Sequence, residues 1–151
     1  MKKLLGIIVL SLLIPILSSC AGTGTKTIPT ISSSSGSTTL YFTRPSAYIA
    51  GAVLASVTVN GSEIGKLGNG EYIQHTINPG NFTIRMKGSG LNALGMGGNS
   101  ISGTGKDGSN HFYIITVKQS FFSSKFQLFQ FLTINFLFFP VQQHAVNSLV
   151  F

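Results

Sequence analysis

The chain has 151 residues, of which 9% are charged and 18 are glycine, and this length predicts one domain. Its formal charge of +7 includes Lys2 and Lys3, and beyond these two no basic residues are adjacent. Because a nucleic-acid-binding domain gathers its basic side chains into one patch or stripe, this scatter speaks against nucleic acid as a partner.

The first nineteen residues have the pattern of a secretory signal peptide. Lys2 and Lys3 are followed by an apolar stretch, Leu4–Leu17, that is too short to remain as a membrane span. The next residues, Leu17-Ser18-Ser19-Cys20, resemble the bacterial lipobox, which is an aliphatic residue, two small residues and a cysteine. The resemblance implies cleavage between Ser19 and Cys20 and attachment of fatty acyl chains, such as palmitate, to Cys20.

Cys20 is the only cysteine, so the mature chain can form no intrachain disulfide. An ordinary secretory signal that ends in a free thiol is the alternative, and an exposed unpaired thiol would be a liability in an oxidising compartment. Ala21 stands where an aspartate would retain a lipoprotein at the inner membrane of a Gram-negative cell. The sorting pattern therefore implies an outer-membrane location facing the periplasm.

Residues 20–37 are expected to form the lipidated cysteine and a flexible tether. Nearly every residue after Cys20 is glycine, serine or threonine, and such a segment cannot bury enough apolar area to offset its ordering entropy. A coil of this length has a root-mean-square reach of roughly 22 Å. The tether would hold the domain near the membrane but leave it free to move.

From Thr38 the sequence changes to short β-type runs separated by turn signals. Asn60-Gly61 predicts a type I′ hairpin, and Asn78-Pro79-Gly80 predicts another tight turn. Pro45 ends the first run because proline has no N–H for a central ladder. The expected strands are Thr38–Thr43, Val53–Asn60, Ser62–Leu67, Glu71–Ile77, Asn81–Lys87, Phe112–Lys118 and Phe126–Gln130.

These runs predict an all-β domain over residues 38–130, built as a small antiparallel sandwich or barrel. Residues 88–110 hold eight glycines and are expected to be a long loop. We expect disorder there, with two alternatives, namely a functional loop or a membrane-facing segment around Leu91, Leu94 and Met96. Phe112–Lys118 is apolar on both faces, as in a central strand.

Three stretches together resemble a bacterial family, the domain of unknown function 2846. They are Leu40–Ala47 (LYFTRPSA), Val57–Gly70 (VTVNGSEIGKLGNG) and Glu71–Ile84, which ends in NPGNFTI. The resemblance covers roughly residues 38–120 and implies a lipoprotein, but no catalytic or binding residues, because the family has no established activity. The order of the turns is also similar to that of carboxypeptidase-regulatory-like and surface-layer-like sandwiches, which implies an immunoglobulin-like topology.

Few groups in the mature chain could carry out catalysis. Its carboxylates are Glu63, Glu71 and Asp107, and the first two are expected to be solvated turn flanks. His75 has no partner at ligand spacing and is expected to be a core or cross-strand histidine. We therefore expect no enzyme activity, no metal and no cofactor. Arg44 is the one candidate binding residue, with a guanidinium over a strand edge as the structural alternative.

Two functions follow from the sequence. The first is a non-enzymatic envelope lipoprotein that binds or scaffolds an envelope protein or cell-wall partner at the membrane. The alternative is a small-ligand binder or enzyme that uses the glycine-rich loop as a lid over Arg44.

The C-terminal end is unusually rich in phenylalanine. Both faces of this segment are apolar, and a small sheet offers too little surface to cover both. We therefore expect residues 131–151 to form a poorly defined tail outside the fold.

Overall fold

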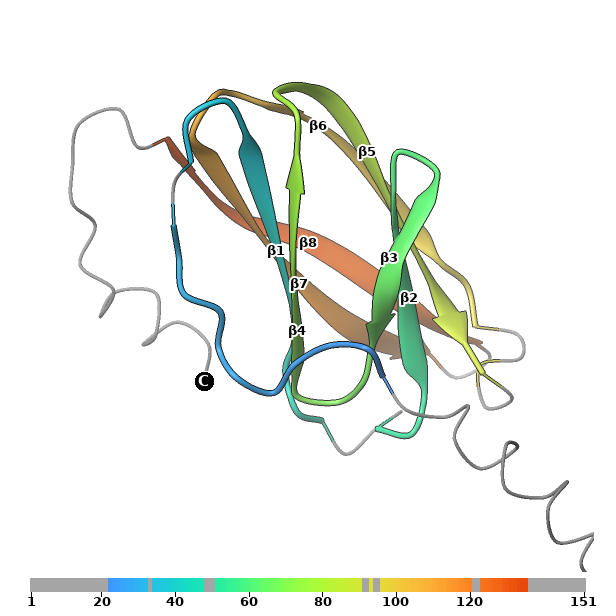
Figure 1. Ribbon diagram of the computed structural model, residues 1–151. Helices are drawn as coiled ribbons and strands as arrows, with labels where there is room; N and C mark the ends of the chain where they lie inside the picture. Colours follow the sequence, from blue (N-terminus) through green and yellow to red (C-terminus); the bar gives the residue numbers. More distant parts are fainter. Residues whose placement is uncertain are drawn as a thin grey trace, which may run out of the picture.

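The computed structural model describes residues 22–32, 34–47, 51–90, 93, 96–120 and 123–135. This part of the chain folds into two four-stranded sheets that pack face to face (Figure 1). The predicted all-β sandwich is therefore confirmed. The strands are β1 (Thr38–Arg44), β2 (Leu54–Val59), β3 (Ser62–Leu67), β4 (Glu71–Ile77), β5 (Gly80–Ser89), β6 (Asn99–Gly105), β7 (Ser109–Ser120) and β8 (Ser123–Asn135).

One sheet has the order β4-β1-β7-β8 and the other the order β3-β2-β5-β6. Successive strands alternate in direction, and β2–β3, β5–β6 and β7–β8 pair as antiparallel neighbours. The one departure from antiparallel pairing among the described strands joins β1 to β7, which run side by side in the same direction. β7 lies between β1 and β8, which confirms its predicted central position.

The core follows from side-chain alternation along the strands. In β5, Phe82, Ile84 and Met86 are buried while the residues between them are exposed, as their pattern predicts. Phe42 of β1 stacks on Tyr113 of β7 in the interior, with 5.3 Å between ring centroids. The same alternation places Leu40, Val57, Ile115 and Phe126 in the core.

The first hairpin turn and the end of the first strand also lie where the sequence predicts them. Asn60 and Gly61 both have positive φ angles, of 50° and 86°, which a type I′ hairpin requires. β1 ends at Arg44, directly before Pro45. These two positions fix the register of the hairpin and the end of the first strand.

The prediction of one long loop over residues 88–110 is wrong, because much of this range forms strands. β5 continues to Ser89, β6 occupies Asn99–Gly105, and β7 begins at Ser109. Ile101 of β6 pairs with Ile84 and packs on the core, while its neighbours are small and polar. One apolar residue among glycines and serines is enough for an edge strand whose other face is solvated.

The last strand is also longer than expected. β8 runs to Asn135, so residues 131–135, predicted to be tail, belong to this strand, and Leu132–Asn135 pair with Ser109–Phe112 at the start of β7. A register shift at Phe112/Tyr113 lets the strand continue past Gln130. The remaining residues of the expected tail, 136–151, lie outside the described residues.

The segment before β1 differs most from its expectation as a free tether. Thr25 forms a two-way backbone bridge with Tyr72 of β4, and Thr23 bonds to Lys66 of β3. Further along, the backbone N–H of Ser32 donates to the Tyr41 hydroxyl at 3.2 Å. The segment therefore lies along the sandwich (Figure 1). The predicted cleavage and lipidation residues, Ser19 and Cys20, are outside the described residues.

Candidate functional site

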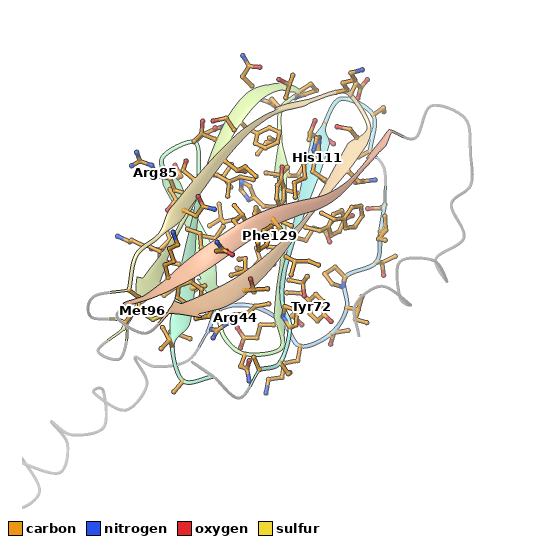
Figure 2. All side chains as sticks on the ribbon, turned by 180° about the vertical axis from the view of Figure 1, so that it is seen from behind. Arg44, Tyr72, Arg85, Met96, His111 and Phe129 are labelled. Atoms are coloured by element: carbon orange, nitrogen blue, oxygen red, sulfur yellow. The ribbon has the colours of Figure 1, made fainter. Side chains whose placement is uncertain are left out.

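Arg44 lies inside the sandwich rather than on its surface (Figure 2). Only 3% of this residue is exposed. Its Nη1 donates to the backbone carbonyl oxygens of Val53, before β2, and of Leu67, at the end of β3, the latter at 3.2 Å. Its guanidinium also lies over the Phe126 ring of β8, 5.3 Å from the centroid. Arg44 therefore joins both sheets at one end of the molecule.

The charge of Arg44 is balanced within the fold. Burial lowers the pKa of its guanidinium, and the nearby Glu71 carboxylate acts in the opposite direction. The two residues are register partners on β1 and β4. Because the guanidinium is buried and bonded to carbonyl groups, it offers no exposed cation to a ligand beneath a glycine-rich lid.

The three carboxylate side chains of the protein also have local partners. Glu71 accepts a hydrogen bond of 2.7 Å from the Gly68 N–H within its own turn, as a turn flank would. Glu63 accepts one of 2.7 Å from the Ser56 hydroxyl and lies 3.9 Å from the Lys66 ammonium. Asp107 accepts from the Gly36 N–H. These contacts hold turns and strand edges in place.

His111 of β7 is buried on the core side, where Phe82 packs edge-on against its ring. Its ring nitrogens lie 3.3 Å from the Ser109 hydroxyl and 3.4 Å from the Gln130 carboxamide. Burial lowers the pKa of His111 and also that of the half-buried His75. His75 is opposite Leu40 in the register, so it is the cross-strand histidine that the sequence predicts.

An open polar hollow lies at the other end of the sandwich from Arg44. It has a volume of about 520 Å³ and is open to solvent. The Asn60 and Asn81 side chains are held by hydrogen bonds of 2.9 Å to Thr83 and 2.8 Å to Thr104. The hollow offers amide and hydroxyl groups to a neutral polar ligand, and its lining residues are Ser37, Asn60, Thr76, Ile77, Asn78, Pro79, Gly80 and Asn81.

Sequence reasoning identified the turns that form this hollow but not the hollow itself. The local sequence marks Asn60 and Asn78–Gly80 only as turn formers. Their approach depends on the β2–β3 turn, within one sheet, lying beside the β4–β5 turn, which connects the two sheets, and nothing in the local sequence signals this arrangement.

Among the described residues, no three histidine, cysteine, aspartate or glutamate side chains gather as metal ligands would. The same part of the chain contains no helix that is both long enough and apolar enough to cross a membrane.

The fold and its internal contacts define the class as a small β-sandwich domain with polar residues used mainly for structure. A family model described as "Protein of unknown function (DUF2846)" matches residues 34–128. The chain belongs to this family, which confirms the resemblance seen in its strand and turn motifs. No curated protein matches the chain.

Proposed function

We propose that this protein is a lipoprotein of the bacterial cell envelope whose β-domain binds or scaffolds a partner at the membrane without catalysing a reaction. The observation that carries the proposal is the sequence Leu17-Ser18-Ser19-Cys20 at the end of an apolar leader, with Cys20 the only cysteine. Two or three acyl chains on one residue suffice for stable anchoring, whereas one chain binds only marginally. Ala21, at the position where an aspartate would retain the protein at the inner membrane, favours the outer membrane, facing the periplasm.

A binding or scaffolding role is supported by how the reactive side chains are used. Arg44 bonds to backbone carbonyls, Glu71 to its turn, and His111 to neighbours within the fold. A general acid or base must instead reach a substrate in an open site. The open hollow is lined by neutral groups, which suits recognition of a sugar or peptide backbone in the cell wall or an envelope protein.

Metabolic labelling with palmitate tests the anchor. The wild-type protein should incorporate label, whereas Cys20→Ser should not. Ser18→Ala keeps a small residue in the lipobox and serves as the matched control that retains labelling. Equal labelling of wild type and Cys20→Ser would overturn the proposal.

A capture experiment tests the binding role. Residues 22–135, immobilised and exposed to envelope extract, should retain a component that Asn78→Trp loses because the indole fills the hollow. The matched control, Lys87→Trp, changes an exposed residue of β5 away from the hollow and should retain the component. Capture that survives Asn78→Trp would rule out the hollow as the site, and no retained component would contradict the binding role.

A further inference from the structure

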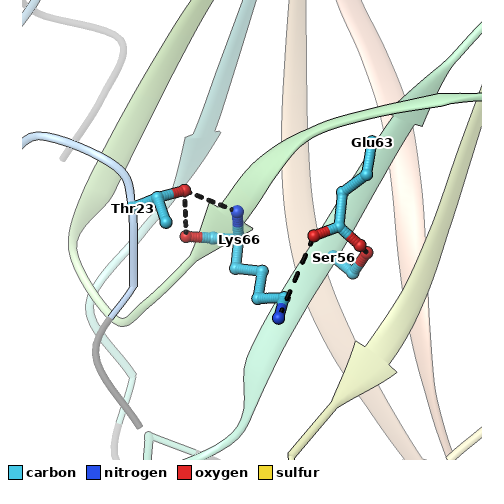
Figure 3. Close-up of polar contacts among 4 residues, drawn as sticks. All are labelled: Thr23, Ser56, Glu63 and Lys66. Atoms are coloured by element: carbon cyan, nitrogen blue, oxygen red, sulfur yellow. Dashed lines mark hydrogen bonds and ion pairs between the residues drawn. The ribbon is translucent and has the colours of Figure 1, made fainter. Parts of the chain in front are cut away.

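The segment behind the anchor is fixed to the sandwich almost from its first described residue. The Thr23 N–H donates to the Lys66 carbonyl at 2.8 Å. The Thr23 hydroxyl accepts from the Lys66 N–H at 2.8 Å and also contacts the Lys66 carbonyl (Figure 3). Two residues later, Thr25 and Tyr72 exchange backbone hydrogen bonds of 2.9 and 2.7 Å. The segment therefore joins the free edges of β3 and β4, which belong to different sheets.

Glycines make this close approach possible. A Cβ atom on Gly24 would lie 2.9 Å from the Glu71 Cβ and 2.9 Å from the Tyr72 carbonyl oxygen. Gly65 of β3 has a φ of 157°, and a Cβ there would lie 2.6 Å from the Thr23 hydroxyl. The glycines on both sides of the contact therefore let the segment pack closely against the sheet edges, so their role is not only to make the segment flexible.

The contact lies at one end of the molecule, which we call the anchor end. At this end β1, β3, β5 and β7 finish and β2, β4, β6 and β8 begin. A Cβ on Gly22 would meet the Glu71 carboxylate and the Gly68 N–H, so residue 22 lies at the turn between β3 and β4. Met96, one of the apolar residues that the sequence suggests could face a membrane, belongs to the β5–β6 connection at the same end (Figure 2).

Only Ala21 separates Gly22 from Cys20. Even a fully extended chain places their Cα atoms at most about 7 Å apart. Acyl chains on Cys20 would therefore enter the bilayer beside the anchor end. A free coil over residues 21–37 would instead let the domain tumble at a reach of roughly 22 Å.

Charge favours the same arrangement. Lys26, Lys87 and Lys125 are exposed and lie in the half of the sandwich nearer the anchor end. The carboxylate in this half, Glu71, is bonded to its own turn and paired in register with Arg44. The other two described carboxylates, Glu63 and Asp107, lie towards the far end. The anchor end thus presents a basic surface that suits anionic lipid headgroups.

We infer that the sandwich is held in one orientation on its membrane, with the anchor end against the lipid headgroups and the far end, with its open hollow, facing away. This inference rests on the proposed lipidation of Cys20. It adds a lipid-contacting surface to the sandwich and assigns partner recognition to the opposite end.

The test uses the lipidated full-length protein in vesicles that contain lipids with a nitroxide-labelled headgroup. A fluorophore is attached to one introduced cysteine, either Ala52→Cys near the anchor end or Ser62→Cys near the far end. Both positions are exposed, and the intervening strand separates them by about 25 Å. Headgroup nitroxides should quench the Ala52→Cys label at least roughly threefold more than the Ser62→Cys label, given that separation.

Gly24→Val should release the segment and make quenching of the two labels nearly equal, because its side chain would overlap Glu71 and Tyr72. The matched control, Thr30→Val, changes an exposed residue of the same segment and should preserve the difference. Equal quenching in wild-type protein whose mass shows acylated Cys20 would overturn the orientation alone. An unacylated Cys20 would overturn both the orientation and the proposed anchor.

Discussion

At the scale of single residues, Arg44 shows that a residue with the sequence pattern of a binding site can instead stabilise the fold. A lone basic residue at the end of an aromatic strand suggested a ligand site. In the structure its guanidinium satisfies two carbonyl groups from the opposite sheet and covers an aromatic ring. Whether a strand-end arginine points outward or inward depends on the turns of the facing sheet, which local sequence does not specify.

Arg44→Ala should lower the free energy of unfolding by about 2–4 kcal/mol, because it leaves buried carbonyl groups without donors. Urea denaturation of the soluble domain measures this change. Arg85→Ala, at an exposed position of β5, should change stability by less than about 0.5 kcal/mol. Equal effects of the two substitutions would contradict the structural role of Arg44.

His111 should make the domain less stable in acid. Burial lowers its pKa below the ordinary value of 6.5, so the folded state resists a proton that the unfolded state accepts. The stability that neutral His111 provides is complete above pH 6.5 and is lost as the pH falls below it. The same direction holds for His75.

Melting temperatures between pH 7.5 and 5 measure this effect. The wild-type domain should melt at lower temperature as the pH falls, and His111→Gln should show a smaller decrease because glutamine does not titrate. His75→Gln tests the weaker contribution of the half-buried residue. A decrease that is unchanged in both variants would assign the acid sensitivity to other groups.

At the scale of elements, sequence predicted strands well where turn chemistry and alternation coincide. Asn60-Gly61 and the alternating Phe82–Met86 pattern each specify one local arrangement, and the structure contains both. β6 could not be predicted in this way, since its glycines and serines become a strand only by pairing with β5. The segment around Thr23 and Thr25 was missed for the same reason, because its partners are distant sheet edges.

The extent of β8 gives a prediction at this scale. Truncation after Gln130 removes the pairs that link Leu132–Asn135 to Ser109–Phe112 at the start of β7. Losing several backbone hydrogen bonds, each worth about 0.5–1.5 kcal/mol net, should lower the free energy of unfolding by roughly 2–5 kcal/mol. Truncation after Asn135 is the matched control and should leave the denaturation midpoint nearly unchanged. If both truncated proteins unfold at the same urea concentration, residues 131–135 are not part of the sheet.

At the scale of the whole molecule, the proposed membrane contact and the proposed partner site lie at opposite ends of the sandwich. The segment that follows the proposed lipid attachment is bonded to β3 and β4 at one end, and the open polar hollow lies at the other. A family assignment without a known activity says nothing about this division. The arrangement of the two ends follows from the topology. Because successive strands run in opposite directions, every second connection lies at the same end of the sandwich.

The mass of the mature N-terminal peptide tests the proposed anchor most directly. Protein purified from its own membrane should begin at Cys20, and that residue should carry the mass of a diacylglyceryl group on its sulfur atom. An N-terminus at any other residue, or an unmodified Cys20 thiol, would contradict the account.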